Sequence, residues 1–124
     1  MSQFHNLDAV PFHTIPNGQL KLIAGTALMV FWADVRGGTE TPRHAHPNEQ
    51  ITWLVEGRMD YQIGNEPIES CGPGTVVLVP ANAPHHVWYH EDCKIVEFFN
   101  PPRIDLFPEA ARNPYGIAEP RVKL

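Results

Sequence analysis

The chain has 124 residues, of which 43% are hydrophobic and 19% charged, so it is long enough for one folded domain and too short for two. Nine basic against fourteen acidic residues give a net charge of -5 without any basic run, which argues against nucleic acid as the main partner. No stretch approaches the roughly 20 apolar residues that span a bilayer, so we expect no membrane partner.

Residues 1–19 are predicted to form an N-terminal arm that leads into the first strand. They mix polar residues with Pro11 and Pro16 and end near the turn signal Asn17-Gly18. The start of this segment lacks the positive charge and apolar run of a secretory signal peptide. We therefore expect a cytoplasmic protein.

Short strands are predicted between residues 20 and 100. Thirteen prolines and nine glycines break up the chain, and β-branched and aromatic runs lie between them. The predicted strands cover 20–24, 26–35, 50–56, 58–63, 75–79, 85–89 and 93–99. Strands 50–56 and 58–63 are expected to pair as a hairpin through Glu56-Gly57. This pattern predicts an all-β sandwich or small barrel.

A neighbouring subunit is expected from two features. In the strand 50–56, Ile51, Trp53 and Val55 alternate with Thr52 and Leu54, so neither face is polar and a homodimer is predicted. Residues 101–124 contain five prolines, and only 109–113 could form a turn of helix. We expect this tail to pack on the barrel or on the partner subunit.

His44-Ala45-His46 is the first candidate for chemistry. Residues two apart on a strand project to the same side, so two imidazoles could reach one metal ion, although an isolated pair also fits surface histidines. Gln50 follows four residues later, and His85 follows a turn that begins at Pro80. Together they would offer three nitrogens and one amide oxygen to one divalent ion, Zn, Ni, Fe or Mn, with open positions for substrate.

Two of these ligands have a neighbour that competes for the role. Glu49 could replace Gln50, but it would project to the other side of a strand. His85 and His86 cannot both face inward, and we favour His85 from its spacing to Pro80. The remaining histidines have no spacing partner and are expected at the surface: His5, His13 and His90.

The spacing of these residues resembles the two motifs of the cupin family. Residues 38–57 resemble the first motif: a glycine, five residues, His44-x-His46, three residues, Gln50, six residues and a glycine. Residues 74–85 resemble the second: a glycine, five residues, Pro80-Ala81-Asn82, two residues and His85. The resemblance implies a single cupin β-barrel (jelly roll) over residues 20–100 with one bound metal ion.

The sequence departs from the usual cupin motifs at three positions. Gln50 stands where glutamate is usual, Asn82 where glycine is usual, and Tyr89 where asparagine is usual. Asparagine can also adopt a left-handed turn. A neutral amide in place of a carboxylate leaves the ion with more positive charge, which favours Lewis-acid chemistry.

A second cluster follows on the last predicted strand. Period two places Glu97 on one face with Ile95 and Phe99. If that face lines the barrel, burial would raise the pKa of Glu97 and make it a candidate acid or base; the alternative is a salt bridge on the outer face. Arg103 follows two prolines, and its planar fork suits a substrate carboxylate unless it serves as a packing residue.

Glu97-x-Phe99-x3-Arg103 resembles the closing-strand motif of small KdgF-type cupins of pectin and alginate breakdown, with glutamate where aspartate is usual. This resemblance implies an isomerase that opens a 4,5-unsaturated uronate to linear 5-keto-4-deoxyuronate. It implies that Glu97 shuttles the proton, Phe99 shapes the pocket and Arg103 holds the carboxylate of the anionic substrate. Two other functions stay open: a metal-dependent dioxygenase of a small organic acid or aromatic, and a non-catalytic small-molecule-binding protein.

Overall fold

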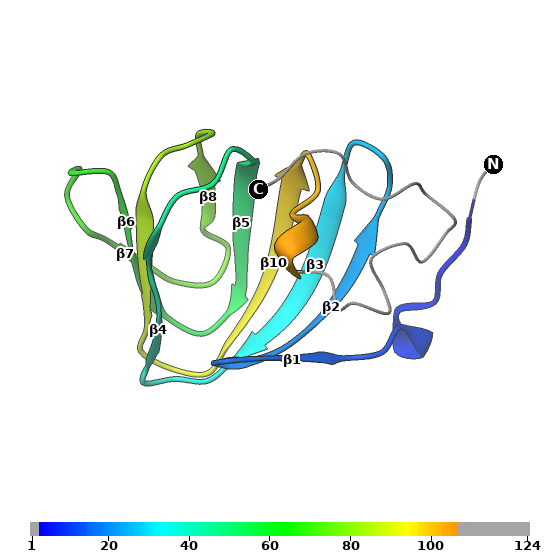
Figure 1. Cartoon of the computed structure of the whole chain (residues 1–124). Helices are drawn as coiled ribbons and strands as arrows, with labels where there is room; N and C mark the ends of the chain where they lie inside the picture. Colours follow the sequence, from blue (N-terminus) through cyan, green and yellow to red (C-terminus); the bar gives the residue numbers. More distant parts are fainter. Residues whose placement is uncertain (1–2, 107–124) are drawn as a thin grey trace.

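A computed structural model of the chain describes residues 3–106. Figure 1 shows two sheets that face each other. The described elements are η1 (Leu7–Ala9), β1 (His13–Ile15), β2 (Gly18–Ala24), β3 (Met29–Val35), β4 (Thr39–His44), β5 (Glu49–Glu56), β6 (Met59–Ile63), β7 (Glu69–Cys71), β8 (Val76–Val79), β9 (His85–Tyr89), β10 (Cys93–Asn100) and η2 (Ile104–Leu106).

The two sheets form the jelly roll that the sequence predicts. The larger sheet has the strand order β1-β2-β3-β10-β5-β8, and the smaller has the order β4-β9-β6-β7. Every paired strand runs antiparallel. Along β3, Met29, Phe31, Ala33 and Val35 are buried, whereas the residues between them are partly exposed. This period-two burial is what places alternate side chains in the barrel interior.

The predicted hairpin between residues 50–56 and 58–63 is wrong. β5 pairs with β10 and β8, whereas β6 pairs with β9 and β7, so the chain crosses from one sheet to the other at Gly57. Gly57 has φ +99°, and a Cβ at this position would lie 2.5 Å from the backbone oxygen of Asp92 and 2.7 Å from Sγ of Cys93. A glycine is required here because both the backbone conformation and the close contact exclude a side chain.

Three strands of the structure have no counterpart among the predicted strands: β1, β4 and β7. β1 lies within the predicted arm and pairs with β2. Of the predicted tail, the structure describes only residues 101–106, so the possible helical turn at 109–113 lies outside the described residues. Within residues 3–106, no helix has the length and apolar character needed to cross a bilayer.

The outer face of the larger sheet is apolar where β10, β5 and β8 adjoin. Ile51 lies opposite Phe98 and Leu78 on the neighbouring strands, and Trp53 lies opposite Val76. These five side chains are 39–61% exposed. Scattered exposed apolar residues are common, but a contiguous patch on several strands favours a partner surface. The homodimer stays a prediction, and we place its interface on this face because two identical apolar faces related by a two-fold axis would cover each other.

Leu78→Lys is expected to convert a dimer of this kind into monomers. Each copy would bury an unpaired ammonium group in the interface, at a cost of about 2–3 kcal/mol per group. The two groups together weaken association roughly 10³- to 10⁴-fold. Light scattering during size-exclusion chromatography measures the mass directly. Gln62→Lys, on the smaller sheet, is the control, and a wild-type protein with the mass of one chain at every concentration would contradict the prediction.

Candidate functional site

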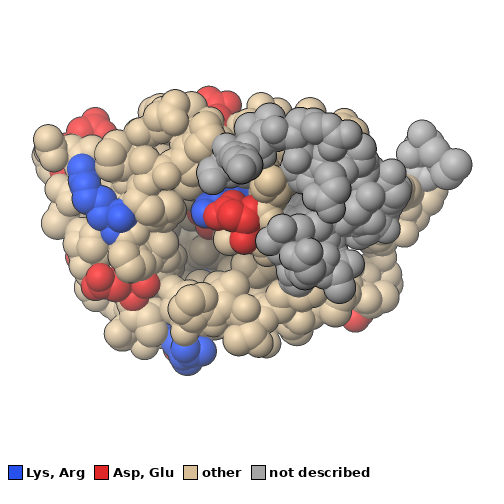
Figure 2. All heavy atoms as spheres, in the orientation of Figure 1, with Lys and Arg blue, Asp and Glu red and all other residues tan. Residues whose placement is uncertain are grey.

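A cavity of about 450 Å³ opens between the two sheets. Figure 2 shows the hollow in the face of the molecule that Figure 1 presents. The sequence-predicted residues that line this cavity are His44, Gln50, His85, Glu97 and Arg103. The structure therefore brings together residues from four strands, β4, β5, β9 and β10, and from the segment after β10, which are up to 59 positions apart in sequence.

A β-bulge in β4 aims His44 into this cavity. Thr41 lies opposite Val87 on β9, but His44 rather than Arg43 lies opposite His85, so β4 contains one extra residue. An extra residue in one strand reverses the faces of the residues that follow it. Pro42, which has no backbone N–H to donate, stands in the bulged segment, where the loss of a ladder bond is tolerated.

His46 lies just beyond the end of β4 rather than on a strand. Its backbone oxygen accepts a hydrogen bond from the backbone N–H of Asn82 at 2.8 Å. Asn82 has φ +66°, the left-handed conformation that the sequence allows at this turn. The turn before β9 therefore holds the backbone of His46 in place, and the two cupin-like motifs are connected directly.

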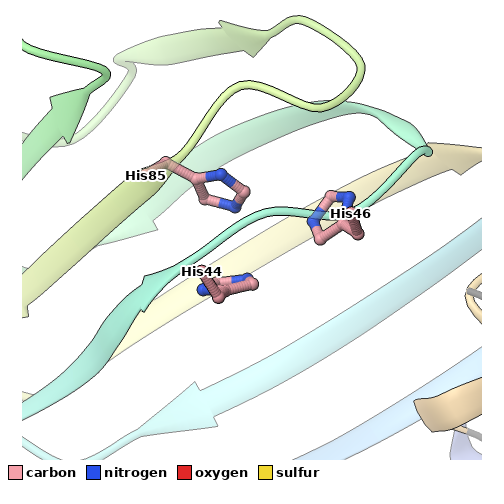
Figure 3. Close-up of side chains that lie close together, drawn as sticks. All are labelled: His44, His46 and His85. Carbon is pink, nitrogen blue, oxygen red and sulfur yellow. The ribbon is translucent and has the colours of Figure 1, made fainter.

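The three histidines converge on one point, as Figure 3 shows. One ring nitrogen from each of His44, His46 and His85 lies within 4.8 Å of those of the other two. Each Nδ1 faces a backbone carbonyl oxygen at 2.8, 3.1 and 2.9 Å, respectively. An Nδ1–H that donates to a carbonyl leaves the Nε2 lone pair available to a metal ion. The triad could therefore bind a metal ion.

Burial keeps two of these imidazoles neutral. Desolvation lowers the pKa of His85 to about 4 and also lowers the pKa of His46, with a smaller contribution from the positive charge of Arg103. His85 Nε2 is buried without a hydrogen-bond partner among the described residues. A neutral imidazole with an unpartnered nitrogen is the form that binds a divalent cation.

Gln50 adds an oxygen to the triad. Its Oε1 lies 3.0 Å from His46 Nε2, and its Nε2 donates to Glu97 Oε2 at 2.5 Å and to Thr52 at 2.9 Å. A neutral His46 has only one ring proton, so it cannot donate to both Gln50 and the carbonyl of Asn48. A cation held by the imidazole and the amide oxygen would satisfy both acceptors, so the donor set fits a divalent metal ion. Glu49, by contrast, is exposed.

Glu97 lies on the inner face of β10, opposite Thr52 on β5. Its Oε2 accepts hydrogen bonds from Gln50 and Thr52, whereas its Oε1 has no hydrogen bond to any described residue. Burial raises the pKa of Glu97 from the ordinary 4.5 to about 7, although the donors and the positive charge of Arg103 oppose the shift. A carboxyl group with this pKa can both take and give a proton near neutral pH.

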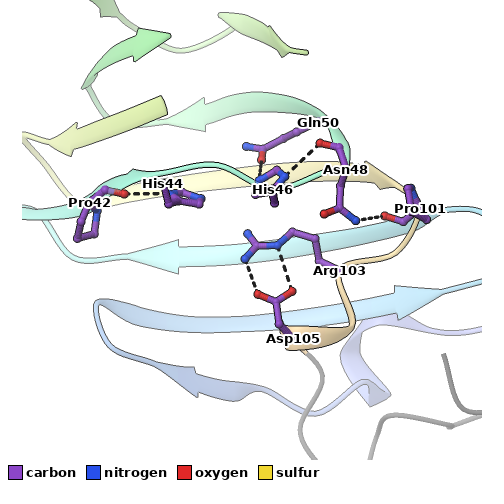
Figure 4. A network of polar contacts seen from close by, with 8 residues as sticks. All are labelled: Pro42, His44, His46, Asn48, Gln50, Pro101, Arg103 and Asp105. Atoms are coloured by element: carbon purple, nitrogen blue, oxygen red, sulfur yellow. Dashed lines mark hydrogen bonds and ion pairs between the residues drawn. The ribbon is translucent and has the colours of Figure 1, made fainter. Parts of the chain in front are cut away.

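Arg103 reaches the cavity from the segment after β10. Its side chain is 15% exposed and forms an ion pair with Asp105, which Figure 4 shows. The guanidinium carbon lies 5.6 Å from the centre of the Phe99 ring. Phe99 is 1% exposed and does not line the cavity; it packs edge-on against His46 at 5.9 Å. The structure therefore places Phe99 behind the site, in contact with both a histidine and the arginine.

The other histidines lie away from the cavity. His86 points to the outer face of the smaller sheet, where it stacks on Trp88 at 3.9 Å and contacts Glu40 at 3.3 Å. His90 pairs with Asp60 at 3.0 Å. His5 is exposed, and His13 is partly exposed on β1.

Several polar residues beside the site were not identified from the sequence, among them Asn48, Thr52, Tyr61 and Asp105. Asn48 is fully buried, and its Nδ2 donates to the backbone oxygen of Pro101 at 2.5 Å, which ties the histidine loop to the segment that carries Arg103. Tyr61 OH lies 3.2 Å from Gln50 Nε2. A polar residue at an inward position of a strand or next to a candidate ligand is the signal that could have identified Thr52 and Asn48.

The structure resembles several solved proteins. KdgF from a Halomonas species superimposes with a TM-score of 0.77 at 23% identity, over 85% of this chain and 100% of that chain. An RmlC-like cupin from Shewanella frigidimarina gives 0.78 at 20% identity, over 85% and 96%. Ectoine synthase from P. lautus gives 0.74 at 15% identity, over 82% and 79%. At these identities the similarity establishes the fold.

Family membership rests on the sequence itself. No curated protein matches the chain. The model of the cupin domain matches residues 31–99, which include the three histidines, Gln50 and Glu97. This match covers more than half of the chain and contains both motifs. The chain belongs to the cupin family.

Proposed function

We propose that this cupin is a metal-dependent enzyme that converts a 4,5-unsaturated uronate into linear 5-keto-4-deoxyuronate. One observation carries the proposal: a single cavity is lined by histidines of the triad, by the carboxyl group of Glu97 and by the guanidinium of Arg103. These groups can hold a cation, move a proton and bind a carboxylate. The similarity to KdgF in fold and in the Glu97-x-Phe99-x3-Arg103 pattern supports the choice of substrate.

The metal ligands in this proposal are His44, His46, Gln50 and His85. Their donor atoms are three imidazole nitrogens and one neutral amide oxygen, so the set adds no negative charge to a bound divalent ion. The bound ion would supply Lewis acidity toward oxygen atoms of the substrate. Glu97 keeps the amide oxygen turned toward the histidines, because its carboxylate accepts a hydrogen bond from the amide nitrogen.

Arg103 binds the substrate carboxylate in this proposal. A guanidinium group pairs with a carboxylate through two parallel hydrogen bonds, which fixes both the position and the orientation of the sugar. The cavity volume of about 450 Å³ lies within the range of small-molecule sites. Phe99 supports Arg103 and His46 from behind, so we assign it a positioning role rather than contact with substrate.

Glu97 moves the proton. Ring opening breaks the bond between carbon 1 and the ring oxygen and leaves an aldehyde at carbon 1 and an enol at carbon 5. Glu97 takes a proton from the hydroxyl on carbon 1 and gives it to the ring oxygen as the enol forms. It then takes the enol proton and gives one to carbon 4, which leaves a ketone at carbon 5 and restores the carboxylate. The overall step is an isomerisation with no net change in atoms or electrons. We assign these transfers to Oε1, which has no hydrogen bond to any described residue.

The reaction is tested by following the ultraviolet absorbance of the conjugated double bond in unsaturated galacturonate. The metal-loaded wild type is expected to remove this absorbance, and Arg103→Ala is expected to lower kcat/KM about 10- to 150-fold, because a hydrogen-bonded charge partner is worth about 1.5–3 kcal/mol. Elemental analysis of the same sample identifies the ion. Oxygen uptake with small acids would instead indicate a dioxygenase, and binding of uronate without turnover would indicate a binding protein.

A further inference from the structure

Asp105 is a charged residue beside the site to which the proposed function gives no role. It lies in η2, two residues after Arg103, and Figure 4 shows the two side chains face to face. Arg103 donates from Nε to Oδ1 at 3.3 Å and from Nη2 to Oδ2 at 2.6 Å. Asp105 is 44% exposed and is not among the residues that line the cavity. The carboxylate therefore holds the guanidinium from outside the cavity.

This pair uses only one edge of the guanidinium. A guanidinium offers a side edge, formed by Nε and one terminal nitrogen, and an end edge, formed by the two terminal nitrogens. Asp105 occupies the side edge, and the Phe99 ring lies 5.6 Å from the guanidinium carbon. Nη1 has no hydrogen bond to any described residue. The end edge thus remains available to a ligand.

We propose that Asp105 is a positioning residue that holds the side edge of Arg103 so that the end edge binds the carboxylate of a ligand in the cavity. The inference rests on the proposed role of Arg103. An arginine that is already oriented loses less rotational freedom when a ligand binds, which is worth about three- to tenfold in affinity. Asp105 and the ligand need not compete, because they use different edges of the same group.

Calorimetry on the metal-loaded protein tests this without turnover. The ligands are galacturonate, a saturated uronate, and its neutral methyl ester. Wild type is expected to bind the acid more tightly than the ester. Asp105→Asn is expected to weaken binding of the acid about three- to tenfold and to change binding of the ester less than twofold. Asp34→Asn is the matched control, because Asp34 is 43% exposed and pairs with Lys94 away from the cavity.

The unsaturated uronate adds a kinetic readout. For Asp105→Asn, KM should rise about three- to tenfold with kcat within twofold, because the residue acts on binding. Arg103→Lys retains the positive charge, but the lysine ammonium group has no two edges with which to bind Asp105 and the ligand separately. Adding Asp105→Asn to Arg103→Lys is therefore expected to change the affinity for galacturonate less than twofold further, as two residues that act through one contact are not additive.

Four results would overturn the inference: tighter binding of galacturonate by Asp105→Asn, equal losses for acid and ester, additive losses with Arg103→Lys, or no preference for the acid in wild type. The first would make Asp105 a competitor of the ligand, and the second would make its role purely structural. If the protein shows the expected binding pattern but leaves unsaturated galacturonate unchanged, the role of Asp105 stands and the proposed reaction is wrong.

Discussion

His85→Ala is expected to abolish metal binding, whereas His86→Ala, one residue further along β9, is expected to leave it intact. His85 is 1% exposed and faces the other two histidines, whereas His86 stacks on Trp88 on the outer face. Removal of one proposed ligand should lower metal affinity at least about 100-fold. Turnover should fall on the order of 1000-fold, because Lewis-acid stabilisation is worth several kcal/mol. Elemental analysis of the purified variants gives the metal content.

Thermal unfolding supplies a second readout for the same pair of variants. A ligand that binds only the folded state raises the midpoint of unfolding. Added metal should therefore raise the midpoint of wild type and His86→Ala and leave that of His85→Ala unchanged. Equal metal content in His85→Ala and wild type would contradict the proposed ligand set, as would loss of metal from His86→Ala.

The strands that cover the core could be predicted because their burial follows period two. The predicted strand 93–99 is Cys93–Asn100 in the structure, and the predicted strand 26–35 is Met29–Val35. β4 could not be predicted in this way, since Thr39–His44 is mostly polar and contains a proline. This strand is stabilised by pairing with β9 rather than by apolar side chains, and it lies at the cavity.

Strand pairing could not be predicted from local pattern. The sequence around Gly57 indicates a turn between two strands, and a turn of this kind fits a hairpin or a crossing between sheets equally well. The choice depends on the contact of Gly57 with Asp92 and Cys93, which are 35 and 36 residues further along the chain. Contacts between residues this far apart cannot be recognised from the roughly ten residues around Gly57.

The same limit applies to the prediction of the candidate site. The residues that converge could be identified. The motif spacing selected His44 and His85, and the alternation along 93–99 put Glu97 on one face with Ile95 and Phe99, which the structure shows to be the buried face. The hydrogen bonds that orient them could not. Asn48 reaches Pro101 across 53 positions, and the ion pair of Arg103 depends on how the chain turns after β10. Residue type and spacing predict which groups meet, and tertiary contacts decide how each group is held.

Glu97→Gln is expected to remove turnover and to stabilise the metal-free protein. Glutamine cannot exchange a proton, so kcat should fall about 10²- to 10⁴-fold. Its side-chain oxygen can still accept hydrogen bonds from Gln50 and Thr52, so metal content should stay near that of wild type. The absorbance assay and elemental analysis on one sample separate these two effects.

The stability gain follows from the pKa of Glu97. Burial raises it to about 7 in the folded protein, above the ordinary 4.5. As pH rises from 4.5 to 7, the unfolded chain releases this proton before the folded protein does, so the free energy of unfolding falls over that window and is lowest above pH 7. The loss is about 3–4 kcal/mol, because each pKa unit between 4.5 and about 7 corresponds to about 1.4 kcal/mol. Glutamine has no such titration, although its amide hydrogens need partners in the barrel.

Urea unfolding of the metal-free proteins at pH 5 and pH 8 measures this difference. Glu97→Gln is expected to exceed wild type by about 1–2 kcal/mol at pH 8 and to differ little at pH 5. Glu49→Gln is the matched control, because Glu49 is exposed one position before Gln50. Glu49→Gln should leave stability, metal content and turnover unchanged. Loss of metal from this variant would mean that the fourth ligand is Glu49 rather than Gln50. A Glu97→Gln protein less stable than wild type at pH 8 would mean that the buried carboxylate stabilises the fold, contrary to its raised pKa.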